Sequence, residues 1–238
     1  MIPDPGEMSS GALSEPLAWS LLPDTAELGP SGGLRVGGVD LASLCEEVGT
    51  PVFVYDEEHM RRRCREAVEA WGPGVAYASK AFLCMEMARL AHAEGMCLDV
   101  ATGGELHVAL SAGVDPERLV LHGNNKSDAE ISRALEVGVG RIVVDSFDEI
   151  DRLERLAPGS GRRPSVMVRV TPGIEAHTHE FVMTGQEDSK FGFGLASGAA
   201  REAVARLGRA GSPVELTGIH AHIGSQIFAL ESFEKAVG

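Results

Sequence analysis

Residues 75–82, with the sequence VAYASKAF, form a short apolar stretch that contains a single lysine, Lys80. The turn-forming sequence GPG at residues 72–74 precedes it, which predicts a buried strand entered from a tight turn. Residues 81–92 then contain helix-forming side chains without a glycine or proline. The lysine is therefore expected at the carboxyl end of a strand and before a helix, where parallel α/β proteins place their active sites.

A lysine in this position has two explanations. Partly apolar surroundings lower the pKa of a lysine ammonium, and the neutral amine is a nucleophile toward an aldehyde. The alternative is a surface lysine just past a strand, without a chemical role. Position alone leaves both explanations open for Lys80.

The composition is typical of a glycine-rich α/β protein, with 44% hydrophobic residues and 29 glycines among 238 residues. The net charge of −14 argues against a protein that binds nucleic-acid phosphates. Four cysteines without C-x-x-C spacing indicate reduced thiols. The sequence has neither an apolar run of membrane-spanning length nor the pattern of a signal peptide. We therefore expect a cytoplasmic protein with no nucleic-acid or membrane partner.

Composition and periodicity suggest one large domain with an extension before it. Residues 1–35 are rich in Pro, Gly and Ser, and we expect them to form a mobile N-terminal extension. A single domain is expected over residues 36–238. Its first predicted elements are a helix at 39–48, a strand at 51–55 and a helix at 57–71 that Asp56 caps.

From residue 75 onward a strand-and-helix unit recurs at a spacing of about 21 to 24 residues. The expected strands cover residues 75–80, 97–102, 118–123, 141–146, 165–170 and 215–224. Residues 171–198 interrupt the pattern with a polar insertion that contains His177 and His179, either a ligand pair or part of a solvated loop. A helix is expected at 199–207. The alternation predicts an α/β fold with a parallel sheet, of the (β/α)8 TIM-barrel type.

Six strands are two fewer than a closed barrel of this type requires. Residues 231–238 have the pattern of the start of a further helix. We therefore expect a barrel that is incomplete at its C-terminus, belonging to a longer protein.

Polar residues follow the predicted strands. Because the carboxyl ends of parallel strands meet at one face, we expect these side chains to lie together. They are Lys80, Asp99, His122, Asn124, Asp145, Arg169, His220, His222 and Ser225. Each has an ordinary alternative, since an aspartate often caps the next helix and a buried histidine is often a hydrogen-bonded core residue. Polar groups at every strand end favour a catalytic face over coincidental capping.

His220 and His222 are two residues apart on one predicted strand, so their side chains share a face. Two chemistries use such a pair. In metal-dependent barrel hydrolases an H-x-H pair binds zinc. Alternatively, an imidazole stacks on an aromatic cofactor whose aldehyde Lys80 holds, and the glycine and hydroxyl of Gly224 and Ser225 then suit a phosphate contact.

Seven motifs occur in order between residue 36 and the end of the chain. They are YASKAF (77–82), LDVATGGE (98–105), HGNNKS (122–127), RVTPG (169–173), HTH (177–179), SKFGFG (189–194) and HAHIGSQ (220–226). Together they resemble the pyridoxal-phosphate-dependent decarboxylases with an alanine-racemase-like barrel. The NNKS and GSQ variants resemble the branch that decarboxylates diaminopimelate more than the ornithine or arginine branches.

The resemblance implies pyridoxal 5′-phosphate as the cofactor, no metal ion, and decarboxylation of meso-diaminopimelate to L-lysine and CO2. The implied catalytic residues are Lys80, which forms the Schiff base, and His222, which stacks on the pyridine ring. The other implied cofactor-binding residues are Asp99, Arg169, Gly224 and Ser225.

Some parts of the family pattern have no counterpart in this sequence: the last barrel strands, the glycine-rich phosphate loop and a C-terminal β-domain. We therefore expect the 238 residues alone to be inactive, and the full-length protein to be a homodimer whose subunits share a site for a small amino-acid substrate. Three alternatives stay open: a decarboxylase of this fold for ornithine, arginine or carboxynorspermidine, a zinc-dependent barrel hydrolase, and a non-catalytic binding relative.

Overall fold

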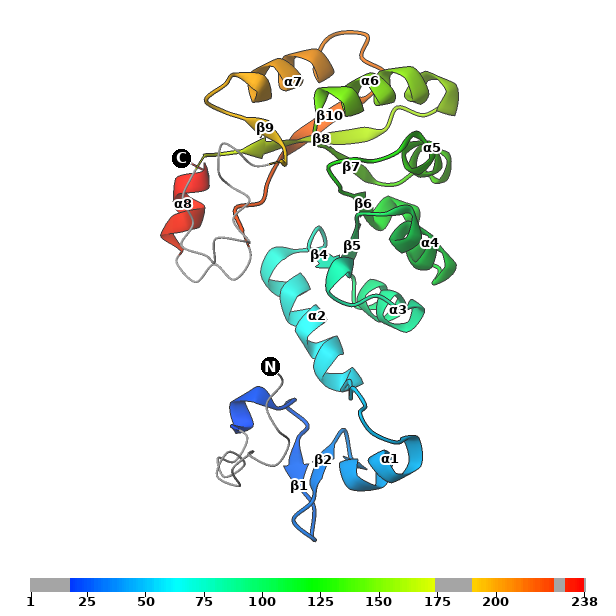
Figure 1. Ribbon diagram of the computed structural model, residues 1–238, viewed down its shortest axis with the longest axis vertical. Helices are drawn as coiled ribbons and strands as arrows, with labels where there is room; N and C mark the ends of the chain where they lie inside the picture. Colours follow the sequence, from blue (N-terminus) through cyan, green and yellow to red (C-terminus); the bar gives the residue numbers. More distant parts are fainter. Residues whose placement is uncertain (1–17, 174–189, 225–229, 238) are drawn as a thin grey trace, which may run out of the picture. The chain divides into compact units, whose positions relative to one another are not determined.

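The computed structural model describes residues 18–173, 190–224 and 230–237 (Figure 1). The chain divides into two compact units, Met1–Glu66 and Ala67–Gly238. Helix α2 (Glu57–Trp71) spans the division and has the predicted bounds. Oδ1 of Asp56 accepts a hydrogen bond from the backbone N–H of His59 at 3.2 Å, which confirms the predicted helix cap. Within the described ranges, no helix is long and apolar enough to cross a membrane.

The first unit contains a small antiparallel sheet and a helix. Its elements are η1 (Trp19–Leu21), β1 (Glu27–Leu28), β2 (Leu34–Val36), β3 (Val39–Asp40) and α1 (Leu41–Val48). Gly37 and Gly38 adopt positive φ angles of 57° and 78° and connect β2 to β3. The helix expected from residue 39 therefore begins at residue 41, where Asp40 caps it by accepting from the N–H of Ser43 at 2.9 Å.

The strand expected at residues 51–55 is not observed. The described residues supply no strand that pairs with this segment, and its large side chains are exposed, Phe53 by 88%. An apolar run becomes a strand only where a neighbouring strand satisfies its backbone hydrogen bonds. The mobile extension over residues 1–35 and the single domain over 36–238 remain predictions, although β1 and part of β2 lie before residue 36.

The second unit is a parallel sheet with helices on one side. Its strands are β4 (Ala76–Ala78), β5 (Cys97–Val100), β6 (Leu119–Leu121), β7 (Arg141–Val144), β8 (Ser165–Thr171), β9 (Phe193–Gly194) and β10 (Glu215–Ala221). Its helices are α3 (Met85–Ala93), α4 (Gly103–Ser111), α5 (Asp128–Val137), α6 (Phe147–Leu156), α7 (Ala199–Leu207) and α8 (Glu231–Val237). The short 3-10 turns are η2 (Ser79–Ala81), η3 (Pro116–Arg118) and η4 (Ala157–Ser160). Figure 1 shows α3 to α7 along the outer side of the strands.

The strand order β10-β8-β7-β6-β5-β4 follows the chain, and every neighbouring pair is parallel. This order is that of successive units of a (β/α) barrel and confirms the predicted α/β fold class. In the described residues the sheet is open, with β4 and β10 at its ends. The insertion contributes an unpredicted short strand, β9, which pairs with β8 beyond the end of β7.

The side of the sheet that faces the helices forms the core. Its strand residues are Leu98, Val100, Leu119, Leu121, Ile142, Val144, Val166 and Val168, each at most 1% exposed. Burying each such side chain contributes about 1.5–3 kcal/mol, so this layer fixes which way every strand faces. Because side chains alternate along a strand, the residues between these positions point to the opposite face.

Candidate active site

The face opposite the helices gathers the polar residues that follow the strands. The strand register pairs Ala78 with Asp99, and Arg169 with His220, so these side chains lie on the same face. The charges of Lys80, Arg169, His122 and Asp99 all act on the imidazole of His222. The structure thus brings together side chains from or just after β4, β5, β6, β8 and β10, as the sequence predicted.

Lys80 lies on η2, just beyond the end of β4. The Tyr77 hydroxyl donates a hydrogen bond to the carbonyl of Phe82 at 2.8 Å, which closes this turn. Ser79 is buried, whereas the Lys80 side chain is exposed. The described part of the sheet is open on this side, which leaves the Lys80 side chain accessible.

Asp99, His122 and His220 form a connected polar group. Oδ1 of Asp99 lies 3.2 Å from Nε2 of His122, and the rings of His122 and His220 meet edge to face with centroids 4.9 Å apart. The sequence placed His122 at a strand end but gave it no role. Its contacts join Asp99 on β5 and His220 on β10 to the segment just after β6, and no spacing in the sequence reveals them.

Both histidines of the H-x-H pair favour the neutral form. Burial is the largest cause that lowers the pKa of His220, and the positive charges of His122 and Arg169 come next. Together they lower this pKa to about 4. Burial, followed by the charge of Lys80, also lowers the pKa of His222. A neutral imidazole next to a lysine can lie against an aromatic ring without charge repulsion.

We expect His220 to titrate near pH 4 in the folded protein instead of near its ordinary value of 6.5. The unfolded chain takes up this proton first as the pH falls, so His220 destabilises the native state progressively between pH 6.5 and 4 and has no such effect above that range. NMR titration of the histidine ring signals, assigned with His220→Gln, measures this pKa. An unshifted value would contradict the burial of the ring beside His122.

Arg169 and Asp145 form the other side of the polar face. Nη1 of Arg169 lies 3.5 Å from Oδ1 of Asp145, and Oδ2 of Asp145 accepts from the N–H of Gly192 at 2.9 Å. The Arg169 guanidinium lies 4.5 Å from the centroid of the Phe191 ring, and Thr171 Oγ1 donates to the Phe191 carbonyl at 2.5 Å. These contacts hold β9 on β8 and leave Arg169 only 9% exposed.

Gly192 is required where β9 meets β8. Its φ is 72°, and an added Cβ would lie 2.9 Å from the backbone oxygen of Arg169. We therefore expect Gly192→Ala to lower the free energy of unfolding by about 1–3 kcal/mol, as measured by urea denaturation. Gly161→Ala is the matched control, because Gly161 has φ of 69° and open space around it. Equal losses of unfolding free energy in the two variants would show that the close approach to the Arg169 backbone has no effect on stability.

The remaining predicted residues take less part in this arrangement. Asn124 is exposed, and Gly224 is half-buried with a φ of 138°. Ser225, His177 and His179 lie outside the described residues. In the part of the chain that is described, no three His, Cys, Asp or Glu side chains are placed to hold a metal ion, so His220 and His222 have no third ligand there.

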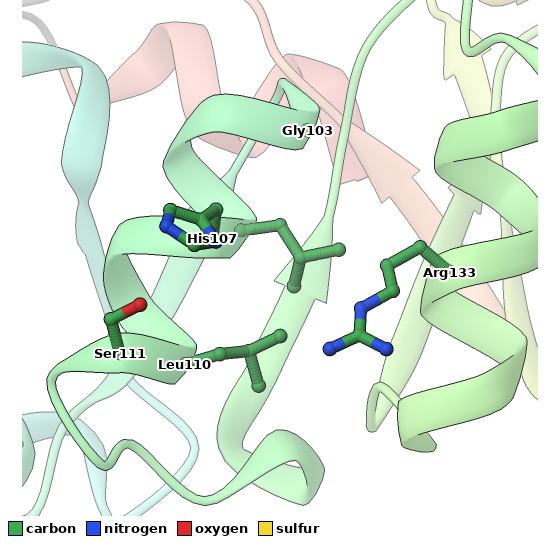
Figure 2. A pocket seen from close by; sticks show the side chains of 6 residues that line it. Gly103, His107, Leu110, Ser111 and Arg133 are labelled. Atoms are coloured by element: carbon green, nitrogen blue, oxygen red, sulfur yellow. The ribbon is translucent and has the colours of Figure 1, made fainter.

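A separate hollow of about 480 Å³ lies between α4 and α5 (Figure 2). Its lining residues are Gly103, Leu106, His107, Leu110, Ser111 and Arg133. Figure 2 shows Arg133 extending from one helix toward side chains of the other. The polar side chains are exposed, and Arg133 donates to Glu136 at 2.7 Å. Nothing in this hollow connects it to Lys80.

The polar face fits a flat aromatic aldehyde that carries an anionic group. It offers an accessible amine at Lys80, a neutral imidazole at His222 and a guanidinium at Arg169. Nδ1 of His220 is buried and has no hydrogen-bond partner among the described residues. The fold and the face together define a (β/α)-barrel-type domain whose polar face can accept a carbonyl cofactor.

A family model described as pyridoxal-dependent decarboxylase, pyridoxal binding domain, matches residues 57–238. The chain therefore belongs to the pyridoxal-dependent decarboxylase family, and its cofactor is pyridoxal phosphate.

Known relatives support this assignment. Diaminopimelate decarboxylase of Mycobacterium tuberculosis is 54% identical over 207 residues, which are 86% of this chain and 46% of that protein. The Mycobacterium leprae enzyme is 51% identical over 222 residues, 92% of this chain and 47% of that protein. The chain thus spans about half the length of the curated relatives that it matches.

Solved structures of diaminopimelate decarboxylases are also similar to this chain. Diaminopimelate decarboxylase from M. jannaschii in complex with L-lysine has a TM-score of 0.79 and 32% identity, and the match covers 90% of this chain and 51% of that one. The Helicobacter pylori enzyme with L-lysine has a TM-score of 0.74 and 30% identity, covering 83% of this chain and 50% of that one. The arrangement of strands and helices described above is therefore shared with these proteins.

Proposed function

We propose that this chain supplies the lysine-bearing part of a decarboxylase site that converts meso-diaminopimelate to L-lysine and CO2. The observation that carries the proposal is the exposed amine of Lys80 close to the neutral imidazole of His222, on the polar face of the sheet. The substrate follows from the similarity to diaminopimelate decarboxylases and from the L-lysine in the structures of two of them.

Each predicted site residue has a chemical role in this proposal. Lys80 holds the cofactor aldehyde, and the uncharged ring of His222 lies against the pyridine. Asp99 and Arg169 hold the polar groups around the lysine, and Gly224 with Ser225 binds on the phosphate side. When bound, pyridoxal phosphate supplies the electron sink for the pair of electrons that departing CO2 leaves on carbon.

The protein also has to supply a proton. Loss of CO2 leaves the reacting carbon one proton short of product, and Nζ of Lys80 is the proton donor that we assign to this step. The surrounding residues orient the scissile carboxylate and exclude water, because stray protons and water divert the reaction.

We further propose that the intact protein is a cytoplasmic homodimer whose subunits share the site for a small amino-acid substrate. The family resemblance supports this assembly. A decarboxylase of the same fold that acts on ornithine or arginine is the alternative, because related enzymes differ in substrate while sharing the cofactor-binding face.

The test is a comparison of substrates. The intact protein with pyridoxal phosphate should release CO2 from meso-diaminopimelate at a kcat/KM at least about 10²-fold above that for L-ornithine or L-arginine. Lysine formation should equal CO2 release. Faster release from ornithine or arginine would overturn the proposed substrate and leave the cofactor assignment standing.

His222→Ala is expected to weaken cofactor binding by about tenfold, because a stacked ring contributes on the order of 1 kcal/mol. The fold should be kept, since the side chain is only half-buried. Spectroscopic titration with pyridoxal phosphate and far-UV circular dichroism measure the two effects. Wild-type affinity for this variant, with a large loss in His220→Ala, would show that His220 is the stacking residue.

A further inference from the structure

Lys126 and Glu149 form a buried ion pair beneath the polar face, outside the set of residues assigned to the cofactor. Nζ of Lys126 lies 2.5 Å from Oε1 of Glu149, and the two side chains are 1% and 4% exposed. Burial lowers the pKa of Lys126 and raises the pKa of Glu149, and the attraction between the two charges opposes both shifts. Each residue therefore depends on the other to stay charged.

The pair binds the backbone at two strand ends. Nζ of Lys126 also donates to the carbonyls of Gly123 and Val143, both at 2.7 Å. The other carboxylate oxygen of Glu149 accepts from the N–H of Asp145 at 2.7 Å. One ion pair thus links the segment after β6 to the end of β7.

These backbone positions adjoin residues of the site. Gly123 directly follows His122, which contacts Asp99 and His220. Asp145, whose N–H the pair holds, directs its carboxylate to Arg169 and to the N–H of Gly192.

We propose that Lys126 and Glu149 are positioning residues for the cofactor site, which fix His122 through Gly123 and fix Arg169 through Asp145. A pair that only stabilised the core would gain little over apolar residues, because removing two charges from water costs about as much as their attraction returns. What apolar residues cannot do is bind the backbone of two neighbouring strand ends at once. This inference rests on the proposed function only for its kinetic test.

The test uses the intact protein with Lys126→Met/Glu149→Gln, which removes both charges and keeps similar shapes. Turnover should fall about 10- to 100-fold, as for other residues that orient a site through hydrogen bonds, while KM stays near the wild-type value. In the cofactor-free protein, the pKa of His220 should move up toward 6.5, because His122 and Arg169 are no longer held close to it.

The matched control is Arg206→Met/Glu154→Gln, which removes an ion pair between α7 and α6, where Nη2 of Arg206 lies 2.6 Å from Oε2 of Glu154. It should leave turnover and the pKa of His220 unchanged. If the buried double variant does not fold, Glu149→Asp replaces it, because it keeps the charge that pairs with Lys126 and withdraws the carboxylate by one methylene, with an expected turnover loss of about tenfold. Wild-type turnover and an unmoved His220 pKa in a folded variant would overturn the proposal.

A wild-type protein that releases no CO2 from meso-diaminopimelate would instead defeat the proposed function, and the histidine titration would still decide the role of the Lys126–Glu149 pair.

Discussion

Lys80→Ala in the intact protein is expected to abolish covalent attachment of the cofactor and to reduce turnover by about three orders of magnitude or more. The other lysines in the described residues are Lys126, Lys190 and Lys235, and Lys235 lies on α8, not at a strand end. Lys126 is buried and bound to Glu149, and Lys190 lies beside Phe191, with its amine 5.2 Å from the ring centroid. The amine that we propose to hold the aldehyde and to return the proton is therefore lost with Lys80.

Borohydride trapping followed by peptide mapping locates the attached cofactor, and the absorbance of the bound cofactor follows its loss. Lys190→Ala serves as the control and should keep both attachment and turnover. Cofactor trapped on Lys126 or Lys190 in the wild-type protein would contradict the assignment. Covalent attachment of the cofactor that persists in Lys80→Ala would also contradict the assignment of Lys80.

Lys126→Met is expected to lower the free energy of unfolding by about 3–5 kcal/mol, because it leaves the carboxylate of Glu149 buried without its partner. The carbonyls of Gly123 and Val143 lose a donor as well. Adding Glu149→Gln should recover more than half of this loss, since it removes the unpaired charge. Lys126→Met alone should therefore be less stable than the double variant.

Urea denaturation of the intact protein measures these differences. Arg206→Met is the control for a more exposed ion pair, because the Arg206 and Glu154 side chains are 27% and 21% exposed. The free energy of unfolding of Arg206→Met should be lower than that of the wild-type protein by about 1 kcal/mol or less. A loss in Lys126→Met no larger than in Arg206→Met would show that Glu149 finds another partner or gains a proton at little cost.

Most of the parallel sheet could be predicted because its strands are continuous apolar runs between helices and turns. Strands buried on one side by helices have this pattern, and the observed β5 to β8 and β10 lie within one residue of the predicted ranges or inside them. The segment at residues 51–55 shows the limit of the pattern. It is an apolar run like the observed strands, but the described residues offer it no pairing partner.

The candidate site could be predicted only as a set of strand ends. Parallel strands bring their carboxyl ends together, so Lys80, Asp99, Arg169 and His222 were expected on one face before any distance was known. The contact of His122 with Asp99 and His220 could not be predicted, because it depends on register between strands.

The sequence by itself determined the parallel α/β architecture and the family, because these depend on local periodicity and on short motifs, and the same motifs led us to propose Lys80 as the lysine that holds the cofactor. Only the tertiary structure decided that Lys80 is exposed, that His220 favours the neutral form, and that Lys126 is bound to Glu149. Whether a side chain is buried or paired depends on neighbours that come from distant parts of the chain. Lys80 and Lys126 both follow strands in the sequence, and only their neighbours in space make one available to a cofactor and the other part of the core.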